Sequence, residues 1–193
     1  EWFKHHLIAD TSFDDCTFDT GMIAIQGKPS SEIVSTLLRT KVDDLSYYTA
    51  RDLGNHVMLS RTGYTGEDGY EIIAPNDQIG TFWQKARDLG CKPAGLGARD
   101  SLRLEMGYPL YGHELTEEIT PYEAGVSWTV HLDKDDFIGK EALMKMKEEG
   151  IPRRRIAFQI EGRGIPRAGY KIFHNDHEVG VVSSGGFSPV LNK

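Results

Sequence analysis

The 193-residue sequence has no excess of basic residues, only two cysteines and no long apolar run. With 22 Lys and Arg against 29 Asp and Glu, the formal net charge is −7. A negative chain gains nothing from counterion release or from an anionic lipid surface, so we exclude general nucleic-acid and membrane binding. No apolar stretch approaches the roughly 20 residues that a membrane-spanning helix needs. We therefore expect small molecules or other proteins as partners.

The two cysteines, Cys16 and Cys91, lie far apart and have no metal-ligand spacing. This pattern does not indicate a disulfide framework and favours a reducing compartment such as the cytoplasm. His174 and His177 have a ligand-like spacing, but they fall on a predicted turn without a third ligand, so we predict no metal site. The first residues lack a signal peptide and an initiator Met, and both ends look cut. We expect a fragment of a longer protein.

The pattern of short strands and amphipathic helices predicts an α+β fold with antiparallel pairing. Ser30, Ser31, Asn76 and Asp77 are good helix caps. The second helix should bury a stripe made of Ile79, Phe82, Trp83, Ala86 and Leu89. The expected strands are 6–10, 21–27, 57–59, 70–74 and 128–132, and the expected helices follow Pro29, Pro75, Gly97 and Phe137.

The most unusual stretch is Arg-Thr-Gly-Tyr-Thr-Gly-Glu-Asp-Gly-Tyr-Glu at residues 61–71. Glycines at every third position are too frequent for a helix and suit a loop whose backbone needs positive φ or close approach to another group. Strand-forming runs before and after the stretch predict a hairpin that presents this loop. The irregular segment 108–124 follows a short helix expected at 98–106.

A helix at 139–149, with Ala142, Leu143 and Met146 inward, ends at Gly150 and a Pro-Arg-Arg-Arg break. We place a domain boundary there, so that 1–150 is an α+β region and 151–193 begins an antiparallel β-domain. Its expected strands are 156–160, 170–173 and 178–184, with Asn175 and Asp176 as the turn of a hairpin.

No nucleophile triad or phosphate loop is present, and Gly95-Leu-Gly-Ala lacks the remaining glycine of a dinucleotide fingerprint. The set Tyr64, Glu71, Arg103 and Tyr111 suggests a different chemistry. A planar heterocycle with adjacent N–H donors needs a carboxylate in its plane, an aromatic face and a fixed cation. The alternative is that Glu71 is an ordinary surface strand residue and Arg103 a solvated helix residue.

Several stretches resemble the T-protein family, the aminomethyltransferases of the glycine cleavage system. The resemblance rests on residues 61–71, 95–105, Tyr-Gly-His-Glu-Leu at 111–115, 120–128, 137–143, 163–170 and 179–189. It covers the chain from Met22 onwards. The family's three-domain cloverleaf implies that residues up to about 150 belong to the folate-cradling α+β domains and that the rest begins a C-terminal antiparallel β-barrel.

The resemblance implies transfer of an aminomethyl group from the lipoyl arm of H-protein to tetrahydrofolate, with release of ammonia and formation of 5,10-methylenetetrahydrofolate. It implies that Glu71 holds the pterin edge, that Tyr64 lines the pocket and that Arg103 lies beside them. Tyr111 and Arg167 are implied neighbours of folate or the lipoyl arm.

The resemblance also places the family's catalytic aspartate before the first residue of this sequence, and the last barrel strands after its end. It therefore implies no catalytic residue within the chain, and we expect the chain to be inactive alone. Three alternatives remain open: a sibling folate-dependent demethylase, a folate domain of a dimethylglycine- or sarcosine-oxidising enzyme, and a non-catalytic folate-binding or interaction module. A related protein of iron–sulfur assembly uses a cysteine-bearing motif at the corresponding loop, which this sequence lacks.

Overall fold

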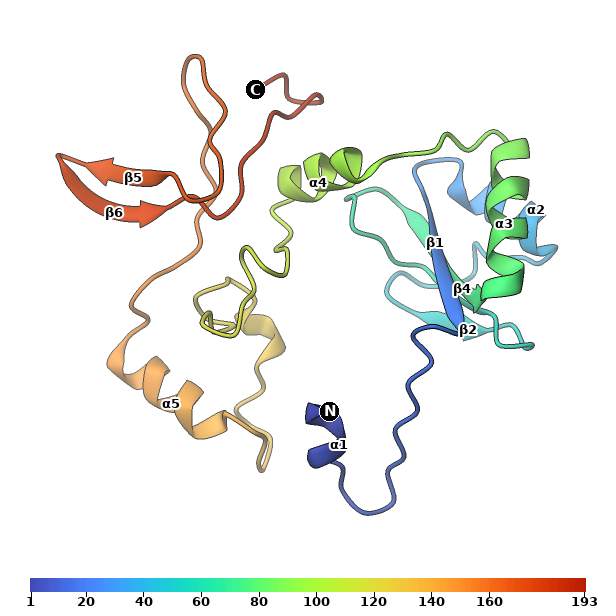
Figure 1. The fold of residues 1–193 in the computed structure, drawn as a ribbon, viewed down its shortest axis with the longest axis horizontal. Coiled ribbons are helices and arrows are strands. Elements are labelled where there is room, and N and C mark those ends of the chain that lie inside the picture. The colour runs from blue at the N-terminus through green and yellow to red at the C-terminus, as the bar shows by residue number, and fades with distance from the viewer. The chain divides into compact units, whose positions relative to one another are not determined.

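A computed structural model describes residues 1–193 (Figure 1). The chain forms two compact units, Glu1–Gly95 and Leu96–Lys193, each described here by itself. Helices and antiparallel strands are mixed, which confirms the predicted α+β class. The helices are α1 (Trp2–His5), α2 (Ser30–Leu38), α3 (Asn76–Asp88), α4 (Leu96–Glu105), the 3-10 turn η1 (Ser127–Thr129) and α5 (Lys140–Glu149). The strands are β1 (Thr20–Gln26), β2 (Ala50–Asp52), β3 (Met58–Ser60), β4 (Gly69–Pro75), β5 (Lys171–His174) and β6 (His177–Val181).

The first unit is built on a four-stranded antiparallel sheet in the order β1-β4-β3-β2. The predicted hairpin is confirmed, because β3 pairs with β4 in a register that sets Ser60 opposite Glu71. On the other side of β4, strand β1 places Ala24 opposite Glu71 and Gln26 opposite Gly69. Strand β4 is therefore central, and its side chains have neighbours on both sides.

The two faces of this sheet differ. Helices α2 and α3 cover one face (Figure 1), where the buried residues form the core: Ile23, Ile25, Val34, Leu37, Val42, Leu45, Val57, Leu59, Tyr70, Ile72, Ala74 and Ala86. Because side chains alternate along a strand, the opposite face carries Ala24, Gln26 and Glu71. We call it the open face, since Met22 and Met58, which also lie on it, are about half exposed.

Several predictions for the first unit are wrong. Residues 6–10 form no strand, because this exposed segment has no neighbouring strand with which to pair. The serine cap of α2 is absent: Pro29 precedes the helix, and Ser30 lies buried and donates to the Asp68 carbonyl at 3.4 Å. Asn76 likewise does not cap α3: it is the first residue of the helix, Pro75 precedes it, and its side-chain amide donates to the Phe18 carbonyl at 2.6 Å.

Only part of the predicted α3 stripe is inside. Ile79, Phe82 and Ala86 pack against the core at helical spacing. Trp83, at the edge of this face, and Leu89, after the last residue of the helix, are exposed. The predicted stop at Gly90 is confirmed, since its φ is 95°.

In the second unit, α4 and α5 confirm the helices expected near 98–106 and 139–149. Of the predicted inward face of α5, Leu143 and Met146 are half-buried but Ala142 is exposed. The β5–β6 hairpin is also confirmed, and its turn residues Asn175 and Asp176 have φ values of 48° and 64°.

Two expected strands of the second unit do not form. Residues 127–129 make the turn η1 in place of a strand at 128–132, and 156–160 has no hydrogen-bonded neighbour, so its alternating apolar residues stay unpaired. Both cysteines are free thiols. None of the helices combines the length and apolar character that crossing a membrane requires. The domain boundary near residue 150 stays a prediction.

Candidate functional site

The glycine-rich loop between β3 and β4 is fixed by an arginine at its base. Arg61 forms a two-pronged pair with Asp68, with Nε–Oδ1 at 2.9 Å and Nη2–Oδ2 at 2.7 Å, and its Nη1 donates to the Leu45 carbonyl at 2.9 Å. Its guanidinium also lies 5.7 Å from the centre of the Tyr70 ring. The hydrogen bond from Arg61 holds the pKa of Asp68 below its ordinary value, so the pair stays charged.

Glu71 is the carboxylate that the hairpin presents. It lies half-buried on the open face, and its Oε2 accepts a short hydrogen bond from the Thr62 hydroxyl. Because Thr62 donates its one proton to Glu71, its hydroxyl oxygen can only accept from Ser60, 2.8 Å away. The Ser60 hydroxyl also lies 3.5 Å from the Glu71 carbonyl, a longer and weaker contact. The other oxygen, Oε1, accepts no hydrogen bond within the protein. Ala24, opposite Glu71 in the register, is small and exposed and leaves the carboxylate accessible.

Tyr64 lies half-buried in the middle of the same loop. The structure therefore brings two of the sequence-predicted residues, Tyr64 and Glu71, into one loop and strand of the first unit. The other three, Arg103, Tyr111 and Arg167, belong to the second unit.

Arg103, at the end of α4, is only 2% exposed and is the centre of a buried network. Its Nε donates to Asp100 at 2.7 Å, Nη1 to the Tyr108 carbonyl at 3.2 Å and to Glu114 at 3.0 Å, and Nη2 to Ser184 at 2.9 Å. Nη2 also pairs with Asp100 at 2.7 Å. These four hydrogen bonds and the ion pair with Asp100 engage every nitrogen of the guanidinium within the protein.

Glu114 is the carboxylate that this arginine meets, and it is 5% exposed. Burial acts to raise the pKa of Glu114, but hydrogen bonds from Ser183, Ser184 and the Leu110 amide, together with the charge of Arg103, lower it below its ordinary 4.5. The pair is therefore ionised at neutral pH and ties the segment 108–114 to 183–184.

A cavity of about 550 Å³ lies next to this network within the second unit. Arg103, Glu114, Ser183 and Ser184 supply polar walls, and the rest of the lining is largely apolar: Leu104, Ile156, Phe158, Ile160, Ile165, Phe187 and Leu191. Tyr111, which is 73% exposed, and the exposed Arg167 do not line it.

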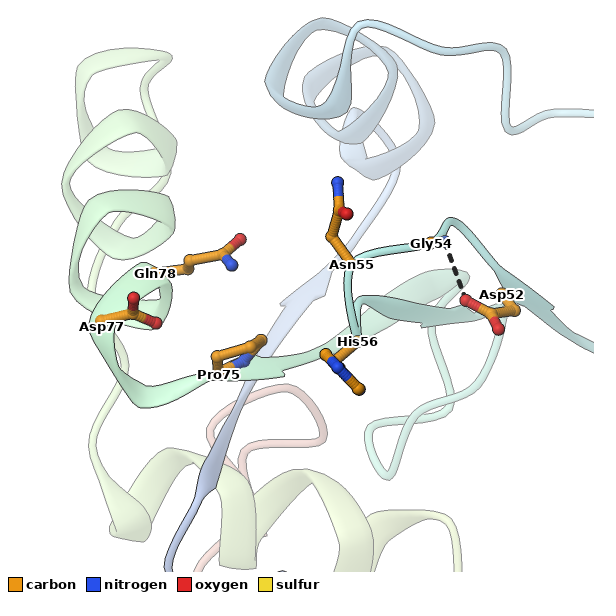
Figure 2. Close-up of a pocket in the computed structure, with 7 residues that line it drawn as sticks. All are labelled: Asp52, Gly54, Asn55, His56, Pro75, Asp77 and Gln78. Carbon is orange, nitrogen blue, oxygen red and sulfur yellow. Dashed lines mark hydrogen bonds between the residues drawn. The ribbon is translucent and has the colours of Figure 1, made fainter.

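The first unit has a separate surface hollow of about 690 Å³, shown in Figure 2. Its lining comes from the β2–β3 turn, with Asn55 and His56, and from the junction of β4 and α3, with Pro75, Asp77 and Gln78. Asp52 accepts a hydrogen bond from the Gly54 amide at 2.8 Å beside it. None of the sequence-predicted site residues lines this hollow, and it is too open to enclose a ligand, so we assign it no function.

Sequence reasoning missed Gln26, Thr62 and Glu114 as parts of these networks. Thr62 and Glu114 lie within the motifs quoted for the family resemblance, next to residues that were singled out. Nothing in the pattern marked Gln26, whose partners are 36 to 44 residues away.

Two family models match the chain. The GCVT N-terminal domain matches residues 1–134, and the glycine cleavage T-protein C-terminal barrel domain matches residues 153–193. An aminomethyltransferase of Thermoanaerobacter sp. (strain X514) is 43% identical over 202 residues, and the match covers 100% of this chain and 55% of the relative. An aminomethyltransferase of Halothermothrix orenii (strain H 168 / OCM 544 / DSM 9562) is 48% identical over 199 residues, and the match covers 100% of this chain and 56% of the relative.

Among solved structures, the glycine cleavage system aminomethyltransferase T from Bartonella henselae superimposes with a TM-score of 0.84 at 32% identity. That match covers 90% of this chain and 49% of the other. The chain thus spans about half the length of the relatives that it matches. Since the N-terminal model alone accounts for more than half of the residues, and the barrel model matches most of the remainder, the chain belongs to the glycine cleavage T-protein family.

Proposed function

We propose that the protein is a tetrahydrofolate-dependent aminomethyltransferase of the glycine cleavage system and that this chain supplies part of its folate pocket. The reaction moves the aminomethyl carbon from the lipoyl arm of H-protein to tetrahydrofolate, releases ammonia and yields 5,10-methylenetetrahydrofolate. Family membership and relatives named aminomethyltransferase support this assignment. A soluble one-carbon enzyme of this kind would act in the cytoplasm, or in the mitochondrial matrix of a eukaryote.

The observation that carries the proposal is the presentation of Glu71. A pterin edge offers adjacent N–H donors, and a carboxylate accepts both when it is fixed in their plane. Thr62 fixes Oε2 from one side, Oε1 is without a partner, and the exposed Ala24 leaves room beside them. A carboxylate has about four lone-pair sites, so the bond from Thr62 does not exhaust Oε2. The residues present therefore fit the group.

The remaining site residues take roles that follow from their surroundings. Tyr64, from the same loop, supplies an aromatic wall. Every nitrogen of the Arg103 guanidinium is engaged within the protein, so we assign it the task of positioning Glu114 and the segment that contains Tyr108 and Leu110. Tyr111 and Arg167 are exposed and are proposed to contact folate or the lipoyl arm directly.

Titration with tetrahydrofolate, followed by tryptophan fluorescence, tests the proposal. Replacing Glu71 with Gln removes a charged acceptor worth about 1.5–3 kcal/mol, so we expect affinity to fall by about 10- to 100-fold. Glu67→Gln is the matched control, because Glu67 is an exposed acid of the same loop. Equal affinities of the wild type, Glu71→Gln and Glu67→Gln would contradict the assignment of Glu71.

Turnover with lipoylated H-protein separates the enzyme from a non-catalytic folate module. Release of ammonia that depends on both H-protein and tetrahydrofolate supports the aminomethyltransferase. Folate binding without turnover, in the chain and in its full-length gene product, supports the module. Product formed from a methylated substrate without H-protein supports a sibling demethylase.

A further inference from the structure

Gln26, the last residue of β1, has its side-chain amide on the open face, where it meets the glycine-rich loop. Its Nε2 donates to the Thr62 carbonyl at 3.1 Å and to the Tyr70 carbonyl at 3.3 Å, and its Oε1 accepts from the Thr65 hydroxyl at 3.2 Å. Both N–H groups and the carbonyl of the amide are therefore used. One side chain holds the loop at its beginning, its middle and its end.

Two of the loop's glycines make room for this amide. A Cβ added to Gly63 would lie 1.9 Å from Gln26 Oε1, and one added to Gly69 would lie 2.4 Å from Gln26 Cδ. Neither glycine has a φ in the left-handed region, in contrast to Gly66 at 77°. A side chain at Gly63 or Gly69 would thus displace the Gln26 amide from its hydrogen bonds, whereas Gly66 is required by backbone conformation.

We infer that Gln26 is a positioning residue of the site. The Thr62 carbonyl binds Gln26 while the Thr62 hydroxyl binds Glu71, so Gln26 fixes the group that orients the carboxylate. Tyr64 lies between the two anchored residues Thr62 and Thr65, so its backbone is held as well. The effect on the loop stands on contacts within the first unit alone, and the effect on folate affinity rests on the proposed function.

Hydrogen exchange of the loop amides tests the inference without any ligand. Gln26→Met fills nearly the same volume without hydrogen bonds, and Gln26→Glu turns the amide donors into acceptors that face two carbonyls. Two amides report on the loop: Glu67 N–H donates to the Thr65 hydroxyl, and Gly27 N–H donates to the Asp68 carbonyl. We expect their exchange to become about tenfold faster or more in both variants, the equivalent of one to two lost hydrogen bonds. The amides of 22–25 in β1 should keep their rates.

The matched control is Gln84→Met, because Gln84 is an exposed glutamine on α3 whose side chain donates to Asp88, on the same helix, at 2.8 Å. Unchanged exchange of the Glu67 and Gly27 amides in Gln26→Met and Gln26→Glu would overturn the inference. So would equal acceleration throughout β1, because the side chain would then stabilise the unit without acting on the loop.

A double-mutant cycle with Gly63→Ala and Gln26→Ala gives a second test that is independent of hydrogen exchange. Gly63→Ala should lower the melting temperature, because the new methyl group collides with Gln26. In the Gly63→Ala/Gln26→Ala protein the collision is gone, so the melting temperature should be higher than the sum of the two single losses predicts. Strict additivity of the two losses would overturn the inference.

Tetrahydrofolate affinity gives the functional readout. We expect Gln26→Met to weaken binding about tenfold relative to the wild type and Gln84→Met, while the circular dichroism spectrum is retained. A full-length gene product that fails to bind folate would refute the proposed function and leave the exchange result as the test of Gln26. Wild-type binding with full affinity in Gln26→Met would overturn the role of Gln26 and leave the proposed function in place.

Discussion

At the scale of single residues, the second unit depends on two buried carboxylates that are each matched to an arginine. Glu114 meets Arg103 at 3.0 Å, and Glu123 meets Arg153 at 2.7 Å while accepting two further bonds from Thr120. A buried charge is tolerated only when it is paired and hydrogen-bonded. Both carboxylates therefore have pKa values below the ordinary one, and their loss should be costly.

Glu114→Gln should destabilise the chain by about 3 kcal/mol at pH 7, because it leaves Arg103 without its buried counterion. The folded-state pKa of Glu114 is depressed, so its contribution to stability is fully present above about pH 4.5 and disappears as the pH falls through the folded-state value. Urea unfolding between pH 7 and pH 3 should show the difference between wild type and variant shrinking in acid. The exposed Glu117→Gln is the control, and a difference that grows in acid would contradict the expectation.

At the scale of elements, the central hairpin has one face for stability and one for the site. Leu59 of β3 is fully buried against the helices, while its neighbour Met58 is 46% exposed on the open face. Strand alternation produces this separation, since adjacent side chains point to opposite faces. The buried side chains can therefore stabilise the strands, while Glu71 and Gln26 lie on the open face and remain available to the site.

Leu59→Ala should cost about 3 kcal/mol of unfolding free energy, because it leaves a cavity in a packed core. Met58→Ala, one residue away on the other face, should cost less than about 1 kcal/mol. Urea titration of both variants measures the difference. Similar losses would mean that the two faces are not distinct in packing.

The β5–β6 hairpin turns at two residues with positive φ, Asn175 and Asp176. Such a two-residue turn favours Asn-Gly, because glycine adopts positive φ without strain. Asp176→Gly should therefore slow hydrogen exchange of the β5 and β6 amides by a few-fold, while Asp176→Val should speed it. Exchange that is the same in the two variants would contradict the turn geometry.

At the scale of the whole molecule, the chain consists of two compact units and carries a formal charge of −7. It spans about half of the related aminomethyltransferases, so the activity of the complete enzyme remains a proposal here. The negative charge fits a protein whose partners are recognised by shape and specific hydrogen bonds and not by attraction to polyanions.

This charge predicts chromatographic behaviour. At pH 7.5 and about 150 mM salt, where the Debye length is about 8 Å, the chain should not bind double-stranded DNA or heparin. At low salt it should bind an anion exchanger. Salt-sensitive retention on heparin would reveal a basic surface that the net charge conceals.

The sequence by itself determined the elements whose signals are local. Glycine spacing and flanking strand formers predicted the hairpin around 61–71, helical periodicity predicted α2 to α5, and Asn-Asp predicted the last turn; the structure confirms each. The predictions that failed, strands at 6–10, 128–132 and 156–160, were runs of suitable composition without a partner. A strand exists only when another segment accepts its hydrogen bonds, and composition does not show this.

The site residues show the same difference between local signals and long-range contacts. The motifs singled out Tyr64, Glu71, Arg103, Tyr111 and Arg167, and their roles in binding stay proposals. Only the tertiary structure decided that Gln26 reaches across to Thr62, 36 residues away, and that Arg103 meets Ser184, 81 residues away. The physical reason is that strand register and chain reversal create such contacts, so they depend on where distant segments meet and not on the propensity of either segment alone.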